Sequence, residues 1–263
     1  MVLPAIKNYL NIRTSSSPLV VFRISFGLLI LFSIIRFWSK GWIDFLYIEP
    51  TYHFSYQFFD WIKPIGLFTY LIFFICLLSA LCVALGYKYR ISTSILFLTY
   101  TYIELMDKTT YLNHYYLVSL LAFMLIFLPG DSKFLVGSHK KSRFENVPKW
   151  TIDSLKLLLF IVYFYAGLAK INSDWLLEAQ PLKIWLMSKY ELPFFGDNLL
   201  QKNWVHYFMS WGGMLYDLCI PFLLLIKRTR IFAFIMVIIF HVMTKILFPA
   251  IGMFPYCLLY TSD

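Results

Sequence analysis

The chain has 263 residues, of which 60% are hydrophobic and only 14% are charged. This balance is typical of a membrane protein and excludes a soluble globular domain. The net charge of +9 does not indicate nucleic-acid binding, because the basic residues fall in short loops between apolar runs. The four cysteines lie in apolar runs without a CxxC pair, so we expect no disulfide framework, zinc site or thiol redox pair.

Residues 1–18 are predicted to form a cytoplasmic amphipathic segment. Leu3, Ile6, Tyr9 and Leu10 share one helical face, which fits a short helix lying on the membrane surface. The segment is too polar for a cleavable signal peptide, so we expect the first membrane helix to act as its own signal.

Seven apolar runs approach the length of about 20 residues that a membrane-spanning helix needs. They cover residues 19–38, 66–87, 91–106, 114–128, 152–170, 204–226 and 231–248. An eighth run, 251–260, is too short to cross. We therefore predict an all-α, multi-pass transmembrane helical bundle of about seven spans plus a truncated eighth, with interfacial helices in the longer connections. Residues 19–263 form its transmembrane domain, which we expect to be truncated at its C-terminal end.

Lysine and arginine residues give this bundle an orientation. They are concentrated in the N-terminal segment and in the connections after the second, fourth and sixth spans, which places these parts in the cytoplasm. The connections after the third and fifth spans then share the external face, periplasmic or lumenal. Arg23 lies inside the first run, where it either snorkels to the interface or faces the bundle and pairs with an acid.

Lys170 ends the fifth run, in the stretch FIVYFYAGLAKINSDW. In one interpretation its alkyl stem lies in lipid and its ammonium in water. In the other it is a base, because burial favours the neutral amine, which can accept a proton. Asp174, four residues further on, would oppose that effect if it pairs with Lys170.

The connection after the third span, ELMDKTTYLNHYYL, carries several polar side chains where one membrane helix ends and the next begins. Ionisable groups at membrane depth are costly and indicate function. Asn113 and His114 are the stronger candidates because they start an apolar helix, whereas Asp107 is equally well an ordinary boundary charge. His241 lies deep in the seventh span and fits a packing residue, with Lys245 as a helical neighbour. No metal-ligand spacing is present, so we predict no metal site.

Several stretches together resemble the membrane portion of vitamin K-dependent gamma-glutamyl carboxylase, which bacterial relatives share as the HTTM domain. They are DKTTYLNHYYL, FIVYFYAGLAKINSDW, and FHVMTK followed by LFPAIGMFPY, with SPLVVFRISFGLL and LGYKYRIS upstream. The resemblance covers about residues 17–256. Where the animal enzyme has two adjacent lysines, this chain has Ala169 and Lys170. The carboxylase also continues into further helices and a large extra-membrane domain that engages its protein substrate.

The resemblance implies a carboxy-lyase activity. A lysine of the family deprotonates vitamin K hydroquinone, of the menaquinone or phylloquinone type. Oxygen then reacts with the ring to form the epoxide, generating the base that removes a γ-proton from a protein glutamate, to which carbon dioxide adds. Lys170 matches the base, and Asn113 and His114 match the pair that assists it.

The resemblance also implies a quinol pocket, for which Tyr163, His241, Met253, Phe254 and Tyr256 match family positions. The expected partners are the lipid bilayer, the quinol and a glutamate-containing protein substrate. Two alternatives stay open: a non-catalytic protein that binds quinone or lipid, and an epoxidase that does not carboxylate. A transporter would predict inverted repeats or paired broken helices, and neither is found.

Overall fold

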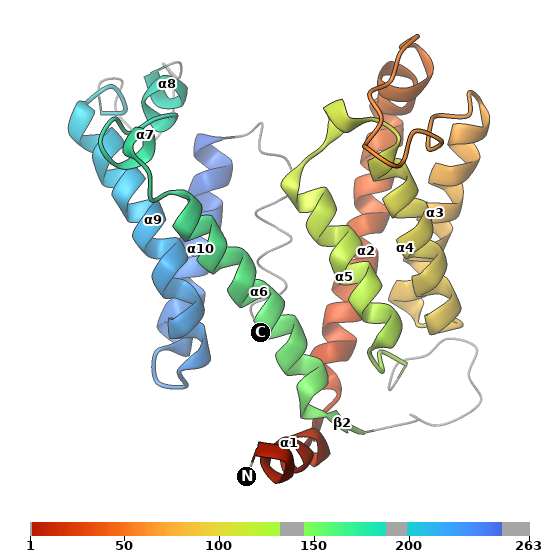
Figure 1. Cartoon of the computed structure of the whole chain (residues 1–263), viewed down its shortest axis with the longest axis horizontal. Helices are drawn as coiled ribbons and strands as arrows, with labels where there is room; N and C mark the ends of the chain where they lie inside the picture. The colour runs from red at the N-terminus through yellow and green to blue at the C-terminus, as the bar shows by residue number, and fades with distance from the viewer. Residues whose placement is uncertain (1, 132–144, 188–198, 249–263) are drawn as a thin grey trace. The chain divides into compact units, whose positions relative to one another are not determined.

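The computed structural model describes residues 2–131, 145–187 and 199–248 (Figure 1). The chain divides into two compact units, and the boundary between Ser154 and Leu155 falls inside one helix, α6 (Lys149–Ala169).

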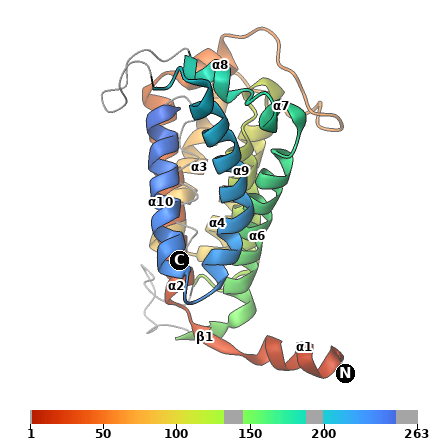
Figure 2. The ribbon, with the colours of Figure 1, turned by 90° about the vertical axis from the view of Figure 1, so that its left-hand side faces the viewer.

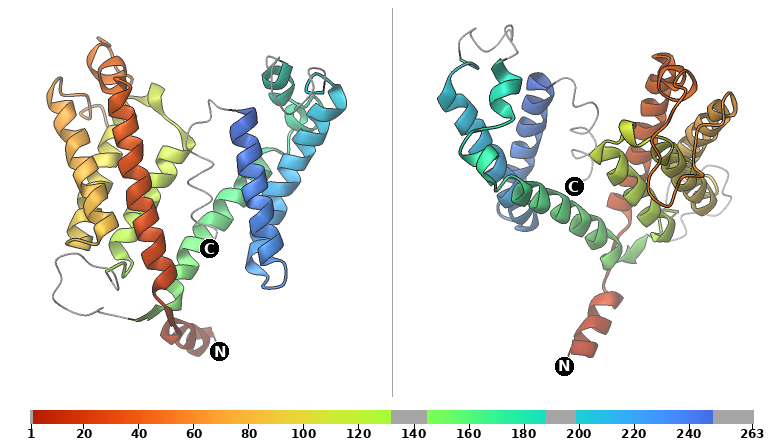
Figure 3. Two further views of the ribbon diagram at one scale, coloured as in Figure 1. Left: turned by 180° about the vertical axis from the view of Figure 1, so that it is seen from behind. Right: turned by 45° about the horizontal axis from the view of Figure 1, so that its top comes forward.

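The first unit is built around four consecutive helices, with smaller elements at their ends. Its helices and strands are α1 (Val2–Asn11), β1 (Arg13–Ser15), α2 (Ser17–Ser39), the π-helix η1 (Asp44–Ile48), α3 (Phe68–Leu85), α4 (Tyr89–Leu105), the 3₁₀ helix η2 (Lys108–Thr110), α5 (Asn113–Phe127), β2 (Asn146–Pro148) and the start of α6. Helix α2 packs on α3, α3 on α4 and α4 on α5, as the view from behind in Figure 3 shows. Neighbours in sequence are therefore neighbours in space, as short connections favour.

The second unit contains the rest of α6 and α7 (Ser173–Leu176), α8 (Leu182–Met187), α9 (Asn203–Leu225) and α10 (Arg230–Leu247). Helix α9 packs against α10, α8 and α7. Figure 2 shows α7 and α8 at the end of the unit where α6 stops. The buried side chains of Leu182, Leu186, Leu200, Val205 and Leu247 form an apolar cluster at this end.

The described residues place a helix at each of the seven predicted runs, and five of these helices are long and apolar enough to cross a membrane: α2, α3, α6, α9 and α10. Helix α4 has 17 residues and α5 has 15, so the prediction of about seven spans is not confirmed. Large apolar side chains such as Phe32, Leu98 and Ile231 are exposed along the helices, which is how a helix surface in lipid is covered. The protein is an integral membrane protein.

One detail differs from the sequence-based expectation. Strands β1 and β2 form a short antiparallel sheet, with Thr14 opposite Val147, so the fold is mostly but not wholly helical. The longer connections contain short helices: the π-helix η1 in 39–63, and α7 and α8 in the described part of 171–203.

Arg23 faces the bundle rather than the lipid. Its side chain is fully buried, and its guanidinium donates hydrogen bonds to the carbonyls of Gly130 at 2.9 Å and Ala84 at 3.4 Å. The carbonyls at a helix C-terminus lack partners within the helix and carry partial negative charge. Arg23 thus ties α2 to residues at the C-terminal ends of α3 and α5. Close by, Gly27 allows α2 to approach α3, since a Cβ there would lie 2.6 Å from the Ala84 nitrogen.

Candidate functional site

Lys170 lies directly after the last residue of α6, in the second unit. Its Nζ donates a hydrogen bond to the carbonyl of Ala166 at 3.1 Å and to Oδ2 of Asp217 on α9 at 2.5 Å. The Lys170 side chain is 21% exposed and that of Asp217 is 8% exposed. The lysine is therefore neither a snorkelling side chain in open solvent nor an isolated buried amine, but the cationic partner of a buried carboxylate.

The local sequence explains why this contact forms. Gly167 is buried against α9, where a Cβ would lie 2.7 Å from the Leu218 side chain and 3.0 Å from its backbone nitrogen. The missing side chain lets the two helices approach closely. Asp217 precedes Leu218, so the same close approach brings its carboxylate within reach of Lys170.

The turn after α6 places an aromatic ring beside the lysine. Asn172 caps α7 by accepting a hydrogen bond from the Trp175 N–H at 2.8 Å. The indole N–H of Trp175 donates to the Ser210 carbonyl on α9 at 2.8 Å. The ring is thereby held so that Nζ of Lys170 lies 5.3 Å from its centroid, within the range of a cation–π contact.

Asp174 does not take part in this pairing. Its side chain is exposed, and its Oδ1 accepts a hydrogen bond from the Ser173 hydroxyl at 3.4 Å. The possible Lys170–Asp174 pair considered from sequence is therefore wrong, because the chain turns into α7 after Lys170 and Asp217 reaches the lysine from α9. Sequence reasoning missed Asp217: it lies 47 residues away, and its only sequence signal is an acid inside an apolar span.

An aromatic cluster lies between α6, α9 and α10 of the same unit. The Tyr163 ring meets that of Tyr216 edge-on at 6.2 Å and that of His241 at 6.3 Å. Tyr216 also stacks on Phe240 with 3.9 Å between centroids. Tyr163 and His241, two of the predicted quinol-binding residues, are thus brought together, and Tyr216 joins them.

The polar atoms of this cluster differ in how they are bonded. The hydroxyls of Tyr163 and Tyr216 are buried and make no well-formed hydrogen bond with the described residues, although the two hydroxyls interact with each other. His241 donates from Nδ1 to the Val237 carbonyl at 2.7 Å, so Nε2 of the neutral ring carries the lone pair. The predicted Lys245 neighbour is not what holds this imidazole in place. Buried hydroxyls without a well-formed hydrogen bond are unusual.

Asn113 and His114, the other predicted catalytic residues, begin α5 in the first unit. Asn113 is exposed, whereas His114 is buried and its ring meets that of Tyr115 at 4.6 Å. Met253, Phe254 and Tyr256 lie outside the described residues.

A second polar cluster precedes α5, centred on Asp107. Its carboxylate accepts hydrogen bonds from the Thr109 N–H at 2.8 Å and the Thr109 hydroxyl at 2.7 Å, and it pairs with Nδ1 of His53 at 3.0 Å. Burial by itself would raise the pKa of Asp107, but these hydrogen bonds together lower it. His53 comes from the 39–63 connection, 54 residues away, where no sequence pattern singled it out.

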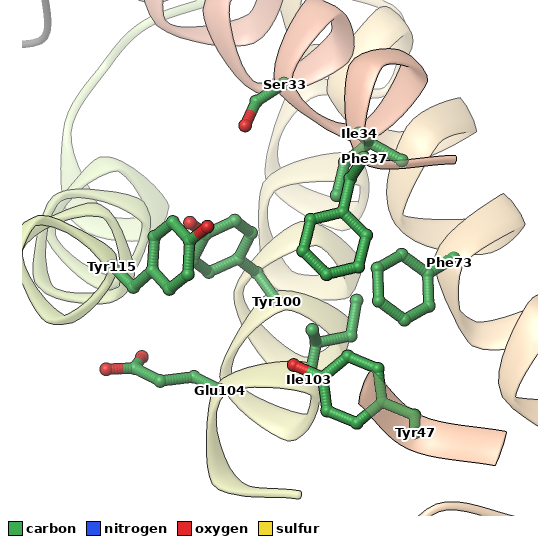
Figure 4. A pocket seen from close by; sticks show the side chains of 9 residues that line it. All are labelled: Ser33, Ile34, Phe37, Tyr47, Phe73, Tyr100, Ile103, Glu104 and Tyr115. Carbon is green, nitrogen blue, oxygen red and sulfur yellow. The ribbon is translucent and has the colours of Figure 1, made fainter. Parts of the chain in front are cut away.

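The first unit also has a partly open cavity of about 30 Å³ between α2, α3, α4 and α5 (Figure 4). The stacked rings of Phe37 and Phe73 line one side, and Glu104 extends toward the Tyr115 side, where its carboxylate accepts a hydrogen bond from Ser119 at 2.5 Å. Burial raises the pKa of Tyr47, another lining residue, to about 12, so its phenol stays neutral. The volume suits a water molecule and is too small for a quinone ring.

Metal binding has no structural support in the described ranges. Across residues 2–131, 145–187 and 199–248, no group of three or more His, Cys, Asp or Glu side chains is placed to hold an ion. What this part of the chain offers instead is an amine paired with a carboxylate and, in the same unit, two buried phenols and an imidazole.

The family model described as the HTTM domain matches residues 11–263. No solved structure matches the chain.

Proposed function

Because this chain belongs to the HTTM domain family, which is linked to vitamin K-related carboxylases, we propose that it oxidises a vitamin K-type hydroquinone in the membrane. The full reaction would couple formation of the epoxide to carboxylation of a protein glutamate. The observation that carries the proposal is Lys170, an amine at the end of an apolar membrane helix whose unit also contains the cluster of Tyr163, Tyr216 and His241.

Each residue has a role that follows from its chemistry. Lys170, in its neutral form, accepts the proton of a quinol hydroxyl as general base. The hydroxyls of Tyr163 and Tyr216, which make no well-formed hydrogen bond in the described structure, hydrogen-bond the quinol oxygens. The Nε2 lone pair of His241 accepts a further hydrogen bond, because its Nδ1 is held by Val237.

When bound at these residues, a hydroquinone would supply, through its reaction with oxygen, the base needed for carboxylation of a glutamate. The assistance of Asn113 and His114, and the lining of the pocket by Met253, Phe254 and Tyr256, remain predictions from the sequence. We further propose that the N-terminus is cytoplasmic and the site faces the external side, as the distribution of Lys and Arg predicts.

The direct test is to incubate the purified protein with reduced vitamin K and oxygen and to assay the epoxide. We expect epoxide with the parent chain and a loss of about 10²- to 10⁴-fold in rate with Lys170→Ala, the usual contribution of a general base. Lys202→Ala is the matched control, since Lys202 is exposed. Equal rates for the parent and Lys170→Ala would exclude the assigned role.

A second candidate function is favoured by the bonding of Lys170. Its ammonium is already satisfied by Asp217 and the Ala166 carbonyl, which is also what a purely structural ion pair requires. In that case the protein binds quinone or lipid without turnover. Saturable quinone binding with no epoxide from the parent chain would select this function. Epoxide without carboxylation of a glutamate peptide would identify an epoxidase-only relative.

A further inference from the structure

We propose that Asp217 is a positioning residue that holds Lys170 in its ammonium form at rest and thereby sets the pH above which Lys170 acts as a base. This inference rests on the proposed function, in which Lys170 deprotonates the quinol. In this proposal Lys170 is a paired amine rather than an isolated buried one. Asp217, which no sequence motif singled out, acquires a role.

The geometry of the contact is that of a charged pair. The distance of 2.5 Å between Nζ and Oδ2 is shorter than the usual range of about 2.7 to 2.9 Å for an ammonium–carboxylate hydrogen bond, so the two groups are in direct contact. Asp217 is buried, and leaving a buried carboxylate without a partner is costly. The carboxylate therefore favours the positively charged form of its neighbour.

Most of the other titratable groups of this unit that we compare with Asp217 are neutral or exposed, so they have little effect on the protonation of Lys170. Tyr163 on α6 and Tyr216 on α9 are neutral phenols whose hydroxyls are buried. His241 on α10 donates to a backbone carbonyl, and Asp174 at α7 is exposed. Lys245, one turn beyond His241 on α10, is a cation, and its charge would oppose that of a Lys170 ammonium rather than favour it. Asp217 is the acid in direct contact with the amine, so its charge dominates the balance between ammonium and amine.

The proton balance of the step follows from this pairing. Above the pH at which Lys170 loses its proton, the Lys170–Asp217 pair consists of a neutral amine and a carboxylate and carries one negative charge. The amine then takes the proton of a quinol hydroxyl, which leaves a quinol anion and an ammonium. The carboxylate of Asp217 stabilises that new ammonium, so it makes the amine a stronger base while requiring a higher pH to form it. The two groups titrate as a pair.

The experiment measures the protonation of Lys170 directly, without relying on turnover. The purified full chain is labelled with acetic anhydride, which acylates only the neutral amine, over a range of pH. Mass spectrometry then follows Lys170 with exposed Lys202 as internal reference. In Asp217→Asn we expect the midpoint of Lys170 labelling to fall by at least about one pH unit, since an opposite charge in contact shifts a titration by one to three units.

Two further variants separate charge from structure. Asp217→Glu keeps the carboxylate, so its midpoint should stay near that of the parent. Asp174→Asn removes the nearby exposed acid and should leave the midpoint unchanged. The proposal would be overturned if Asp217→Asn left the midpoint of Lys170 labelling where it is in the parent. It would also be overturned if Asp217→Glu shifted that midpoint as far as Asp217→Asn does. Thermal unfolding of each variant in detergent confirms that labelling is compared between folded proteins.

The quinol assay then tests whether the Asp217–Lys170 pair controls activity. If the parent makes epoxide, the acid limb of its rate–pH profile should move to lower pH in Asp217→Asn by the same amount as the labelling midpoint. An acid limb that stays in place while the midpoint moves would overturn the link to catalysis. If the parent makes no epoxide, the proposed function fails, while the labelling result still decides whether Asp217 controls Lys170.

Discussion

The two units each pair a buried carboxylate with a basic side chain, and the pairs differ in how many other bonds the carboxylate makes. In the first unit, Asp107 accepts two hydrogen bonds from Thr109 in addition to its contact with His53. In the second unit, Asp217 is bonded to Lys170, which also contacts a carbonyl and an aromatic ring. The first carboxylate organises a turn, whereas the second acts on one amine.

A structural carboxylate and a functional one differ in the number of groups that hold them ionised. A carboxylate with several backbone and side-chain donors stays ionised whatever happens to any one of them. A buried carboxylate that depends on one cation is coupled to that cation's protonation state. Substitutions should therefore affect stability at Asp107 and protonation chemistry at Lys170.

The largest expected effect is that of Lys170→Arg. A guanidinium keeps the positive charge and the bond to Asp217, but it does not lose its proton in a protein. We expect epoxide formation to fall about 10²- to 10⁴-fold, with a thermal unfolding midpoint close to that of the parent. Substantial activity in this variant would show that epoxide formation depends on the positive charge at position 170 and not on proton transfer to Lys170.

Asp107→Ala should be the most destabilising of these changes. It leaves the Thr109 N–H, the Thr109 hydroxyl and His53 without their acceptor. Thr109 is exposed, so water partly replaces the carboxylate, but a hydrogen bond to a charged group still contributes about 1.5 to 3 kcal/mol. We expect a loss of about 3 kcal/mol in the free energy of unfolding, measured by denaturant or thermal unfolding in detergent. Asp60→Ala, at an exposed acid that accepts from Ser55, is the control. Equal stability of the two variants would contradict the role of Asp107.

A smaller effect is expected in the pH dependence of stability. The pKa of Asp107 is lowered in the folded protein relative to its ordinary value of 3.8. Its ionised form therefore stabilises the fold above about pH 4, and this contribution is lost as the pH falls through the lowered folded pKa. The difference in unfolding midpoint between the parent and Asp107→Asn should be largest near neutral pH and shrink below pH 4. A difference that is constant down to pH 2 would show that the charge contributes nothing.

The smallest effect is expected for His53→Gln, which weakens one contact of Asp107 and leaves both Thr109 bonds in place. We expect about 1 kcal/mol or less in unfolding free energy. Asp107→Ala should exceed it clearly in the same assay. If His53→Gln were as damaging as Asp107→Ala, the Thr109 bonds would not be what holds this turn.

Most of the helices could be predicted from the sequence, because a membrane helix is an almost local property. Each apolar run satisfies its own backbone hydrogen bonds, so its length and composition decide its existence and its approximate ends. The number of membrane crossings does not follow in the same way, since α4 and α5 are shorter than the roughly 20 residues that a span needs. The short β1–β2 sheet joins residues far apart in the sequence and left no periodic pattern to detect.

By itself, the sequence determined that the chain is a helical membrane protein, that Lys170 ends an apolar helix and that His114 begins another. The tertiary structure decided the partners: Asp217 rather than Asp174 for Lys170, His53 for Asp107, and backbone carbonyls for Arg23. The physical reason is that a contact between helices depends on their rotation and axial offset. These are set by close packing, as where Gly167 admits Leu218, and not by the composition of either helix alone.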